Sequence, residues 1–277
     1  MTKFPELLVS PHWLADNLNH PQLVIVDCRF ALTNPDLGQQ QYQQSHIPGA
    51  FYLDLNHDLS NTVHTHGGRH PLPDPADFAQ TLARIGITDQ KTFVVAYDDS
   101  RFAFAARLWW LLCYFGHPQI ALLDGGWSQW QARYPVTNEL PNTQMGRFDY
   151  QLHPEKIVDR MAVISCKDQP SVALIDSRDR PRYWGEYEPI DPIAGHIPGA
   201  INFPWKETTD ETGFVRLDQQ RQRWQSLKNT EKIMVYCGSG VTACVNLWSL
   251  EIAGISQGKL YVGGWSDWCS YQNSPES

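Results

Sequence analysis

The sequence predicts an α/β protein of two tandem domains, each a mainly parallel sheet with helices on both faces. Short apolar runs of strand length alternate with longer amphipathic segments, which is typical of a parallel sheet covered by helices. The same motifs recur in the same order in the second half of the chain, which indicates a duplicated domain. A length of 277 residues is long for one core and suits two domains of ordinary size.

Three motifs carry the duplication. They pair Leu23–Arg29 with Val172–Arg178, His46–Ala50 with His196–Ala200, and Leu123–Trp130 with Tyr261–Trp268. The second pair is offset by 150 residues (46 to 196) and the third by 138 (123 to 261). The first copy must therefore carry about a dozen additional residues between these two motifs.

The elements of the first copy follow from hydrophobic periodicity. We expect strands at Val24–Asp27, Phe93–Tyr97 and Ile120–Leu123, and helices at Asp77–Ile85 and Phe102–Phe115. The prolines at 135 and 141, with the polar residues between them, indicate a linker. We place the boundary within residues 135 to 155, with an N-terminal domain over 1–140 and a C-terminal domain over 150–277.

The stretch around Cys237 carries the chemistry that we predict. An apolar run, Ile233–Tyr236, has the length of a buried strand, and Val241–Leu250 has a helical pattern. Between them, the Gly-Ser-Gly at 238–240 permits a tight turn whose backbone N–H groups point inward. These N–H groups and the helix N-terminus favour thiolate over thiol. We therefore interpret Cys237 as a nucleophile; the alternative is a small buried hydrophobic residue.

The two copies differ at this position. A shift of 139 aligns Tyr97-Asp98 with Tyr236-Cys237, so the first copy keeps the strand and helix but has an aspartate in place of the thiol. Only the second half is then capable of thiolate chemistry, and we expect the N-terminal domain to be catalytically inactive. Because small-molecule sites favour domain interfaces, we expect that domain to supply one wall of the cleft.

Together these motifs resemble a tandem-domain rhodanese-type sulfurtransferase over nearly the whole chain. The loop Cys237-Gly-Ser-Gly-Val-Thr-Ala243 is similar to that of the 3-mercaptopyruvate sulfurtransferases, whereas relatives that use thiosulfate commonly have basic residues after the cysteine. The resemblance implies a ping-pong transfer. Cys237 takes a sulfane sulfur from 3-mercaptopyruvate or thiosulfate, holds it as a persulfide, and passes it to a thiol or to cyanide.

Fixed backbone dipoles stabilise an anionic persulfide without a metal or a cofactor. The predicted donors are the N–H groups of Gly238, Ser239, Gly240, Val241, Thr242 and Ala243. The hydroxyls of Ser239 and Thr242 either donate to the leaving group or cap the helix. The resemblance assigns Arg182 to the anionic end of the donor, which a guanidinium fork suits, and it brings His70 over the active cysteine from the insertion.

The chain departs from the family pattern at two places. Ile190 follows Glu-Pro where relatives have a second donor-binding arginine, and Asn56 stands at the position of an acid, with Asp54 two residues earlier. Arg69, beside His70, is a candidate to restore the missing positive charge. The neutral loop favours the monoanion mercaptopyruvate, while the missing arginine favours thiosulfate. We prefer mercaptopyruvate and keep thiosulfate as the alternative donor.

Several other residues have simpler structural interpretations. His46 and His196 occupy equivalent places although only one copy has the thiol, which indicates a structural turn. Arg178 belongs to a duplicated Asp-x-Arg pair, and Trp127 and Trp265 are predicted core anchors. Cys244 either resolves a persulfide or packs in the helix, and we prefer packing.

Composition and charge exclude other classes of protein. A net charge of -8 without a run of Lys or Arg argues against a nucleic-acid or acidic-membrane surface. The absence of an apolar leader or spanning stretch, and six cysteines without paired spacing, predict a cytoplasmic protein with reduced thiols. His64, His66 and His70 lack nearby acidic or cysteine partners, so we predict no metal site.

Two rival functions also require a reactive or rhodanese-like domain of this kind. A cysteine-dependent phosphatase needs an arginine at the end of the loop, where this chain has Ala243. A non-catalytic binding module suits a rhodanese-like domain without its thiol. Asp98 fits that description in the first half, whereas Cys237 does not in the second.

Overall fold

The computed structural model describes residues 4–88, 92–142 and 145–272. The chain divides into two compact units, and each takes a short segment from the other half of the sequence. Unit 1 comprises residues 1–61, 73–153 and 211–215, and unit 2 comprises 62–72, 154–210 and 216–277. The segment 62–72 lies in the predicted insertion of the first copy, so that insertion belongs to the unit that contains Cys237.

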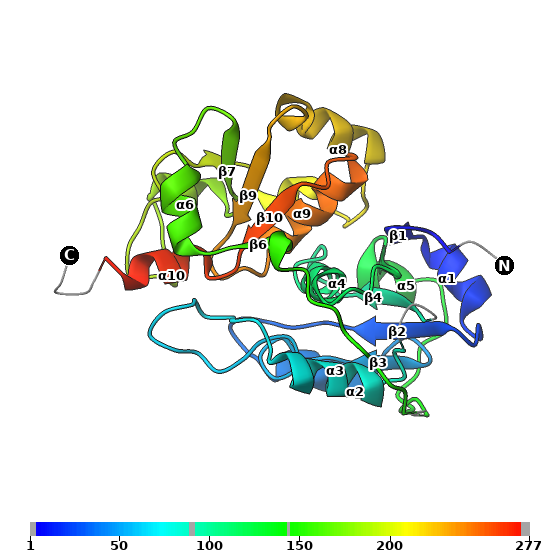
Figure 1. The fold of residues 1–277 in the computed structure, drawn as a ribbon. Helices are drawn as coiled ribbons and strands as arrows, with labels where there is room; N and C mark the ends of the chain where they lie inside the picture. The colour runs from blue at the N-terminus through cyan, green and yellow to red at the C-terminus, as the bar shows by residue number, and fades with distance from the viewer. Residues whose placement is uncertain (1–3, 89–91, 143–144, 273–277) are drawn as a thin grey trace. The chain divides into compact units, whose positions relative to one another are not determined.

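Unit 1 contains a five-stranded, all-parallel sheet in the order β1-β5-β4-β2-β3 (Figure 1). Its strands are β1 (Leu8–Val9), β2 (Leu23–Asp27), β3 (Ala50–Tyr52), β4 (Phe93–Tyr97) and β5 (Ile120–Leu123). Its helices are α1 (Pro11–Asn17), α2 (Leu37–Gln44), α3 (Pro75–Arg84), α4 (Ala105–Tyr114) and α5 (Gly126–Gln131).

Unit 2 repeats this topology, with a parallel sheet in the order β6-β10-β9-β7-β8. The strands are β6 (Ile157–Val158), β7 (Val172–Asp176), β8 (Ile201–Asn202), β9 (Lys232–Tyr236) and β10 (Gly258–Tyr261). The helices are α6 (Arg160–Cys166), α7 (Arg180–Trp184), α8 (Leu217–Arg223), α9 (Ala243–Ile252) and α10 (Gly264–Ser270), with 3-10 turns η1 (Pro154–Lys156), η2 (Trp205–Thr208) and η3 (Gln225–Leu227). The predicted fold class and duplication are therefore confirmed.

Both faces of the first sheet are covered. Val95 and Leu123 pack with Leu14 of α1 and Trp130 of α5 on one face. Because side chains alternate along a strand, Val94 points to the other face, and it is also fully buried. The buried apolar runs that predicted a parallel sheet thus follow from helices on both sides.

The second sheet is covered in the same way. Met234 and Tyr261 pack with Val163 of α6 and Trp268 of α10, while Val235, which points to the opposite face, is fully buried. Figure 1 shows α6 and α9 on opposite sides of β9 and β10. This arrangement fixes β9 in the middle of a core, so that the residue after it is held by rigid structure.

The predicted strands of the first copy lie within one residue of the observed ones, but one helix begins later than expected. We predicted a helix from Phe102, whereas α4 begins at Ala105. Arg101 and Phe102 have φ of 58° and 71°, which is left-handed backbone that cannot continue a right-handed helix. The aspartate before this turn explains the difference, as shown below.

Two of the three duplicated motifs make the same contacts in each unit. Arg29 and Arg178 each make a forked hydrogen bond with the aspartate two residues earlier. The imidazoles of His46 and His196 stack on Tyr42 and Tyr183, with ring centroids 4.0 and 3.9 Å apart. The structural interpretation of Arg178, His46 and His196 is consistent with these contacts.

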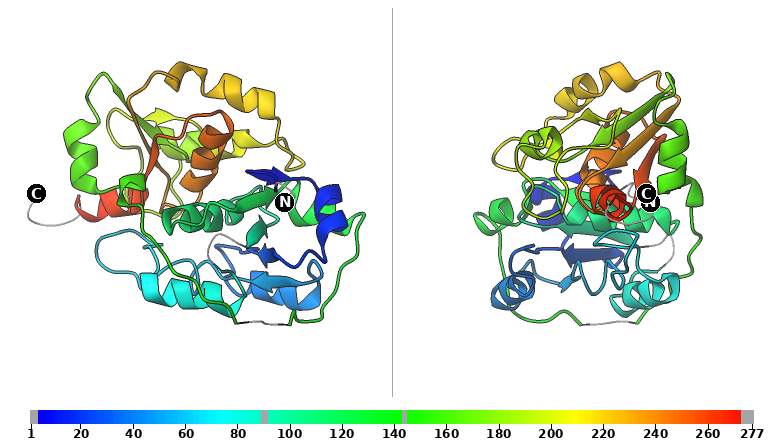
Figure 2. Two further views of the ribbon diagram at one scale, coloured as in Figure 1. Left: turned by 45° about the vertical axis from the view of Figure 1, so that its right-hand side comes forward. Right: turned by 90° about the vertical axis from the view of Figure 1, so that its left-hand side faces the viewer.

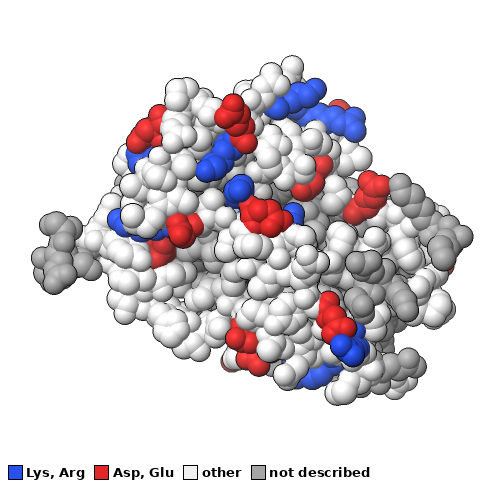
Figure 3. All heavy atoms as spheres, in the orientation of Figure 1, with Lys and Arg blue, Asp and Glu red and all other residues white. Residues whose placement is uncertain are grey.

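The described residues include no helix that is both long and apolar enough to cross a lipid bilayer. On the face drawn in Figure 3, basic and acidic side chains are interspersed, and no continuous basic patch covers that face.

Candidate active site

Cys237 is the first residue after β9 and lies at the carboxyl end of the second sheet, with 2% of its surface exposed. Its carbonyl accepts a hydrogen bond from the Trp265 N–H at 2.8 Å. Gly264 comes so close that an added Cβ would lie 2.5 Å from that carbonyl oxygen, and its φ is +60°. The Gly-Gly-Trp motif is therefore the turn that holds the cysteine in place, which explains its position in the repeat.

The loop after Cys237 has backbone donors at the N-terminus of α9. Gly240 has a φ of +74°, and an added Cβ would lie 2.2 Å from the carbonyl oxygen of Val262, so only glycine fits here. Within residues 4–88, 92–142 and 145–272, the N–H groups of Val241, Thr242 and Ala243 donate to no protein acceptor. Such donors at a helix N-terminus suit an anion.

Ser239 and His70 form a hydrogen-bonded pair beside the cysteine. The Nδ1 of His70 lies 2.7 Å from the Oγ of Ser239, and both residues are buried. Thr242 occupies the N-cap position of α9, but its side chain makes no capping hydrogen bond. Among the described residues, neither hydroxyl therefore caps helix α9.

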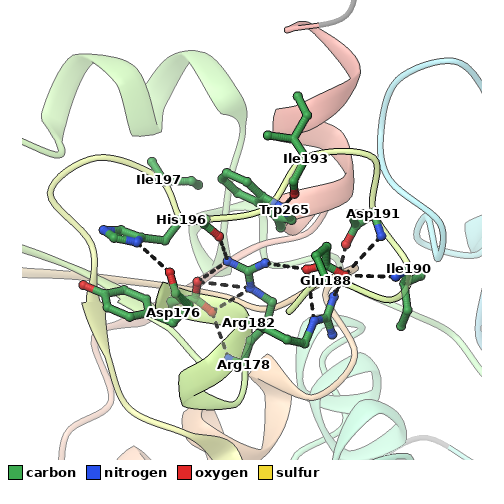
Figure 4. Close-up of polar contacts among 12 residues, drawn as sticks. Asp176, Arg178, Arg182, Glu188, Ile190, Asp191, Ile193, His196, Ile197 and Trp265 are labelled. Atoms are coloured by element: carbon green, nitrogen blue, oxygen red, sulfur yellow. Dashed lines mark hydrogen bonds and ion pairs between the residues drawn. The ribbon is translucent and has the colours of Figure 1, made fainter. Parts of the chain in front are cut away.

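Arg182 lies on α7 and is held by a buried acid that sequence reasoning did not single out. Glu188 accepts hydrogen bonds from the Nε and Nη2 of Arg182 at 3.1 and 2.8 Å, and from Arg178 at 3.2 Å (Figure 4). Burial raises the pKa of Glu188, but the hydrogen bonds from Arg182 and from two backbone N–H groups outweigh it, so the pKa is lowered. Glu188 is therefore a carboxylate that fixes the direction of Arg182.

Asp191 joins Arg182 to a second arginine. Its Oδ2 lies 3.2 Å from the Nη2 of Arg182, and its Oδ1 is paired with the Nη1 of Arg69. Burial raises the pKa of Asp191, and the two neighbouring arginines oppose that shift. The side chains of Asp191 and Glu188 are 1% and 3% exposed, whereas those of Arg69 and Arg182 are 31% and 18% exposed. The two acids are thus more deeply buried than the two arginines that they contact.

The segment 62–72 brings Arg69 and His70 to this site and is fastened to α10. The N–H of Gly67 donates to the Oδ1 of Asp267 at 2.7 Å, and the Nδ1 of His66 lies 2.7 Å from the Oγ of Ser270. The N–H of Arg69 donates to the Oγ of Ser266 at 3.1 Å. Both views of Figure 2 place this segment next to α10. The repeat itself contains the signal for this contact, because the first copy has Gln129 where the second has Asp267.

Other candidates have local roles. Asp54 accepts hydrogen bonds from the N–H groups of Asn56 and His57, which close a turn within residues 54–58. Cys244 is fully buried in α9, and its thiol donates to the Gly240 carbonyl at 3.4 Å, as its packing interpretation requires. No group of three or more metal-ligating side chains comes together in the part of the chain that the structure describes.

The first copy shows what an anion does in an equivalent loop. The Oδ1 of Asp98 accepts from the N–H groups of Ser100 and Phe102 at 2.8 and 3.0 Å. Its Oδ2 accepts from those of Phe104 and Ala105, both at 2.9 Å. The carboxylate is buried and is enclosed by four backbone donors.

Sequence reasoning thus named Cys237, its loop, Arg182, His70 and, as a candidate, Arg69, and the structure places all of them in unit 2. It missed the roles of Glu188 and Asp191. Their only signal was acidity a few residues after Arg182, which is common on any surface loop.

Comparisons with known proteins agree with this geometry. The rhodanese-like domain family model matches residues 10–133 and 163–271. A probable 3-mercaptopyruvate sulfurtransferase of Pseudomonas aeruginosa is 42% identical over 275 residues, covering 97% of this chain and 96% of the relative. The 3-mercaptopyruvate sulfurtransferase of Escherichia coli K12 is 33% identical over 277 residues, covering 96% of both chains.

A solved structure gives the same picture. That of the 3-mercaptopyruvate sulfurtransferase from Leishmania major superposes with a TM-score of 0.84 at 27% identity, covering 99% of this chain and 77% of that one. The likeness therefore extends over both repeats.

Proposed function

The chain belongs to the rhodanese family, and we propose that it is a 3-mercaptopyruvate sulfurtransferase in which Cys237 carries the transferred sulfur. The observation that carries this proposal is a buried cysteine at the end of β9 whose loop has backbone donors that find no acceptor among the described residues. A persulfide anion on Cys237 would use them, so its negative charge is stabilised by dipoles already in place.

The first half-reaction moves one sulfur atom to the enzyme. The Cys237 thiolate attacks the sulfur of 3-mercaptopyruvate, an S–S bond forms, and the donor's C–S bond breaks. The electron pair of that bond stays on carbon as the enolate of pyruvate, which takes up the proton that the donor's thiol gives up. The products are pyruvate and the Cys237 persulfide anion, so atoms and charge balance.

The second half-reaction returns the free thiolate. Cyanide attacks the outer sulfur, the S–S bond breaks, and thiocyanate leaves; a thiol acceptor leaves as its own persulfide in the same way. The electron pair of the S–S bond returns to Cys237. Neither half-reaction requires a cofactor or a metal.

The His70 and Ser239 pair is the group that we assign to proton transfer in the first half-reaction. Its 2.7 Å hydrogen bond lies beside the loop, and imidazole is suited to moving a proton near neutral pH. The pair thus links the donor's thiol proton to the enolate carbon. Arg182 binds the donor's carboxylate, which places the sulfur over Cys237.

Two lines support mercaptopyruvate over thiosulfate as donor. Two relatives that match over 96% of their own length, at 42% and 33% identity, carry the mercaptopyruvate name, while a putative thiosulfate sulfurtransferase of Mycobacterium tuberculosis is 34% identical over 89% of its length. Beside Gly238 the site pairs Arg69 and Arg182 with Glu188 and Asp191, so it carries no excess positive charge to favour a dianion.

We also propose that the N-terminal domain, with Asp98 in place of the thiol, is catalytically inactive and that the protein acts in the cytoplasm. The acceptors, a small thiol or cyanide, belong to this proposal as well.

Steady-state turnover with both donors tests the function, with cyanide as acceptor. The wild type should prefer 3-mercaptopyruvate to thiosulfate, and Cys237→Ser should abolish both activities. Cys166→Ser, a cysteine on α6 outside the loop, is the matched control and should retain them. Full activity of Cys237→Ser would refute the persulfide mechanism, and a preference for thiosulfate would refute the donor assignment.

A further inference from the structure

We propose that Arg69 is the second donor-binding arginine of this site, that it holds the donor's carboxylate together with Arg182, and that Asp191 positions the pair. This inference rests on the proposed function and adds a specificity-determining residue to it. Arg69 comes from the first copy of the repeat, whereas Cys237 and Arg182 come from the second.

The two guanidinium groups lie above the residue next to the nucleophile. A Cβ built on Gly238 would be 3.0 Å from the Nη2 of Arg69 and 3.5 and 3.7 Å from the Nη2 and Nη1 of Arg182. Both cations therefore converge on the space that the absent side chain leaves open. Because Gly238 directly follows Cys237, we expect a donor whose sulfur contacts Cys237 to place its carboxylate near both arginines.

The hydrogen-bond donors that the two arginines do not use on the acids also support binding of the donor's carboxylate. Arg182 uses its Nε and Nη2 on Glu188 and Asp191, and Arg69 uses its Nη1 on Asp191. Across the described residues, the Nη1 of Arg182 and the Nη2 of Arg69 make no hydrogen bond to protein. These are atoms that lie near Gly238, so each arginine keeps donors for an anion.

Asp191 sets the distance between the two cations. One carboxylate oxygen contacts each arginine, so the buried acid bridges them from below. It also removes one positive charge, which lowers the preference of the pair for a dianion. Two arginines with one of their charges neutralised in this way favour a sulfur donor that is a carboxylate monoanion.

Arg69 is not needed to fasten its own segment. Gly67 is held by Asp267, His66 by Ser270 and the ring of Tyr271, and the backbone of residue 69 by Ser266. Replacing the Arg69 side chain leaves these contacts intact. A loss of donor affinity in such a variant therefore reports the guanidinium and not the fold of the segment.

The first test is the KM for 3-mercaptopyruvate in wild type, Arg69→Gln and Arg69→Lys. Arg69→Gln should raise KM about 30-fold with kcat within about threefold, because a charge-assisted fork to the carboxylate is lost. Arg69→Lys should fall between the two, since it keeps the charge and loses the fork. The control Arg147→Gln, an exposed arginine paired with Asp149 in unit 1, should match wild type. A KM for Arg69→Gln within about twofold of wild type would overturn the inference.

The second test separates this inference from the proposed function. Pyruvate keeps the donor's carboxylate, and its binding by calorimetry requires no turnover. Weaker pyruvate binding in Arg69→Gln supports the cation pair even if Cys237→Ser were to retain sulfur transfer. Pyruvate affinity that is equal in wild type and Arg69→Gln overturns the pair even if the persulfide mechanism holds.

The third test replaces Asp191, and here we expect a relative gain in activity with thiosulfate instead of a loss. Asp191→Asn adds one net positive charge beneath the fork, so kcat/KM for thiosulfate should rise about fivefold relative to that for 3-mercaptopyruvate. A purely structural ion pair predicts a lower melting temperature and an equal loss for both donors. That equal loss would overturn the role given to Asp191.

Discussion

The loop that follows β4 and the loop that follows β9 occupy equivalent places in the two sheets, yet they hold an anion in different ways. In unit 1 the Asp98 carboxylate accepts four backbone N–H groups, those of Ser100, Phe102, Phe104 and Ala105. In unit 2 the N–H groups of Val241, Thr242 and Ala243 have no acceptor within the described residues. One loop contains its own anion, and the other is arranged to receive one.

The two loops also differ in the free energy that their backbone conformations cost. In unit 1, Arg101 and Phe102 both have positive φ, which costs a non-glycine residue about 1 kcal/mol or more. In unit 2 the positive φ falls on Gly240, where it carries no such cost. The carboxylate of Asp98 holds the strained turn together, whereas the loop after Cys237 has its positive φ at a glycine.

The aligned loops indicate where a sulfur atom transferred to Cys237 would lie. A shift of 139 aligns Ser100, Phe102 and Phe104 with Ser239, Val241 and Ala243. The outer sulfur of a Cys237 persulfide would lie two bonds beyond Cβ, as does each carboxylate oxygen of aspartate. If Cys237 carries a persulfide as proposed, Asp98 is an internal model of it, supplied by the duplication.

Cys237→Asp is the substitution with the largest expected effect, because it turns the second loop into a copy of the first. Sulfur transfer should fall by about 10³-fold or more, since no nucleophilic sulfur remains. The melting temperature should hold or rise, because the carboxylate gains the free N–H donors. Activity assays and thermal unfolding check both. A strongly destabilised protein would show that the second loop does not accept an anion as the first does.

Asp98→Ala tests the same comparison in unit 1, because it removes the anion from the loop after β4. It leaves four backbone N–H groups, three of them buried, without their acceptor and releases the strained turn, so the free energy of unfolding should fall by about 3 kcal/mol. Chemical denaturation measures this, with Asp99→Ala, an exposed neighbour that contacts Ser128, as the control. Equal stability of Asp98→Ala and wild type would contradict the anion-filled loop.

Glu188 is an acid that the second copy adds to the duplicated frame. Arg29 pairs with Asp27, whereas Arg178 pairs with both Asp176 and Glu188. Glu188→Gln should lower the free energy of unfolding by about 2 kcal/mol at pH 7.

The difference in the free energy of unfolding between wild type and Glu188→Gln should change with pH in a defined direction. Because the folded pKa of Glu188 is lowered, its contribution is fully present above its ordinary value of 4.5 and is lost as pH falls through the folded pKa. The gap between wild type and Glu188→Gln should therefore narrow in acid. Glu207→Gln, at a more exposed pair with Arg180, should show little effect at either pH. A gap that stays constant down to pH 3 would refute the ionised state of Glu188.

Gly238→Ala should have the smallest effect of the four. The first copy has Asp99 at this position, so the backbone tolerates a side chain. An added Cβ meets the ends of two flexible arginines, which can move by a few tenths of an ångström. We expect a change in stability below about 0.5 kcal/mol and a severalfold higher KM for 3-mercaptopyruvate. An unchanged KM would show that the donor does not use this space.

The sequence predicted the parts of this molecule that local pattern controls. The buried runs at β2, β4, β5 and β9 are regular because both faces of each sheet are covered, and the repeat exposed the structural roles of His46 and Arg178. The late start of α4 was not predictable, because it depends on four hydrogen bonds that converge on Asp98.

The missed part of the site has a common physical cause. Asp191 contacts Arg69 across 122 positions of sequence, and Asp267 contacts Gly67 across 200. No periodicity or turn signal reports pairs so distant along the chain. The repeat pointed to an insertion and to a lost arginine, but only the folded chain brings the inserted Arg69 to the site where that charge is missing.

The most direct test of the account is the mass of the protein after treatment with 3-mercaptopyruvate alone, without an acceptor. We predict a gain of one sulfur atom, located by peptide mapping on the fragment that contains Cys237, one equivalent of released pyruvate, and loss of the added mass when cyanide follows. An unchanged mass, or added sulfur on another cysteine, would contradict the central claim that Cys237 carries the sulfur.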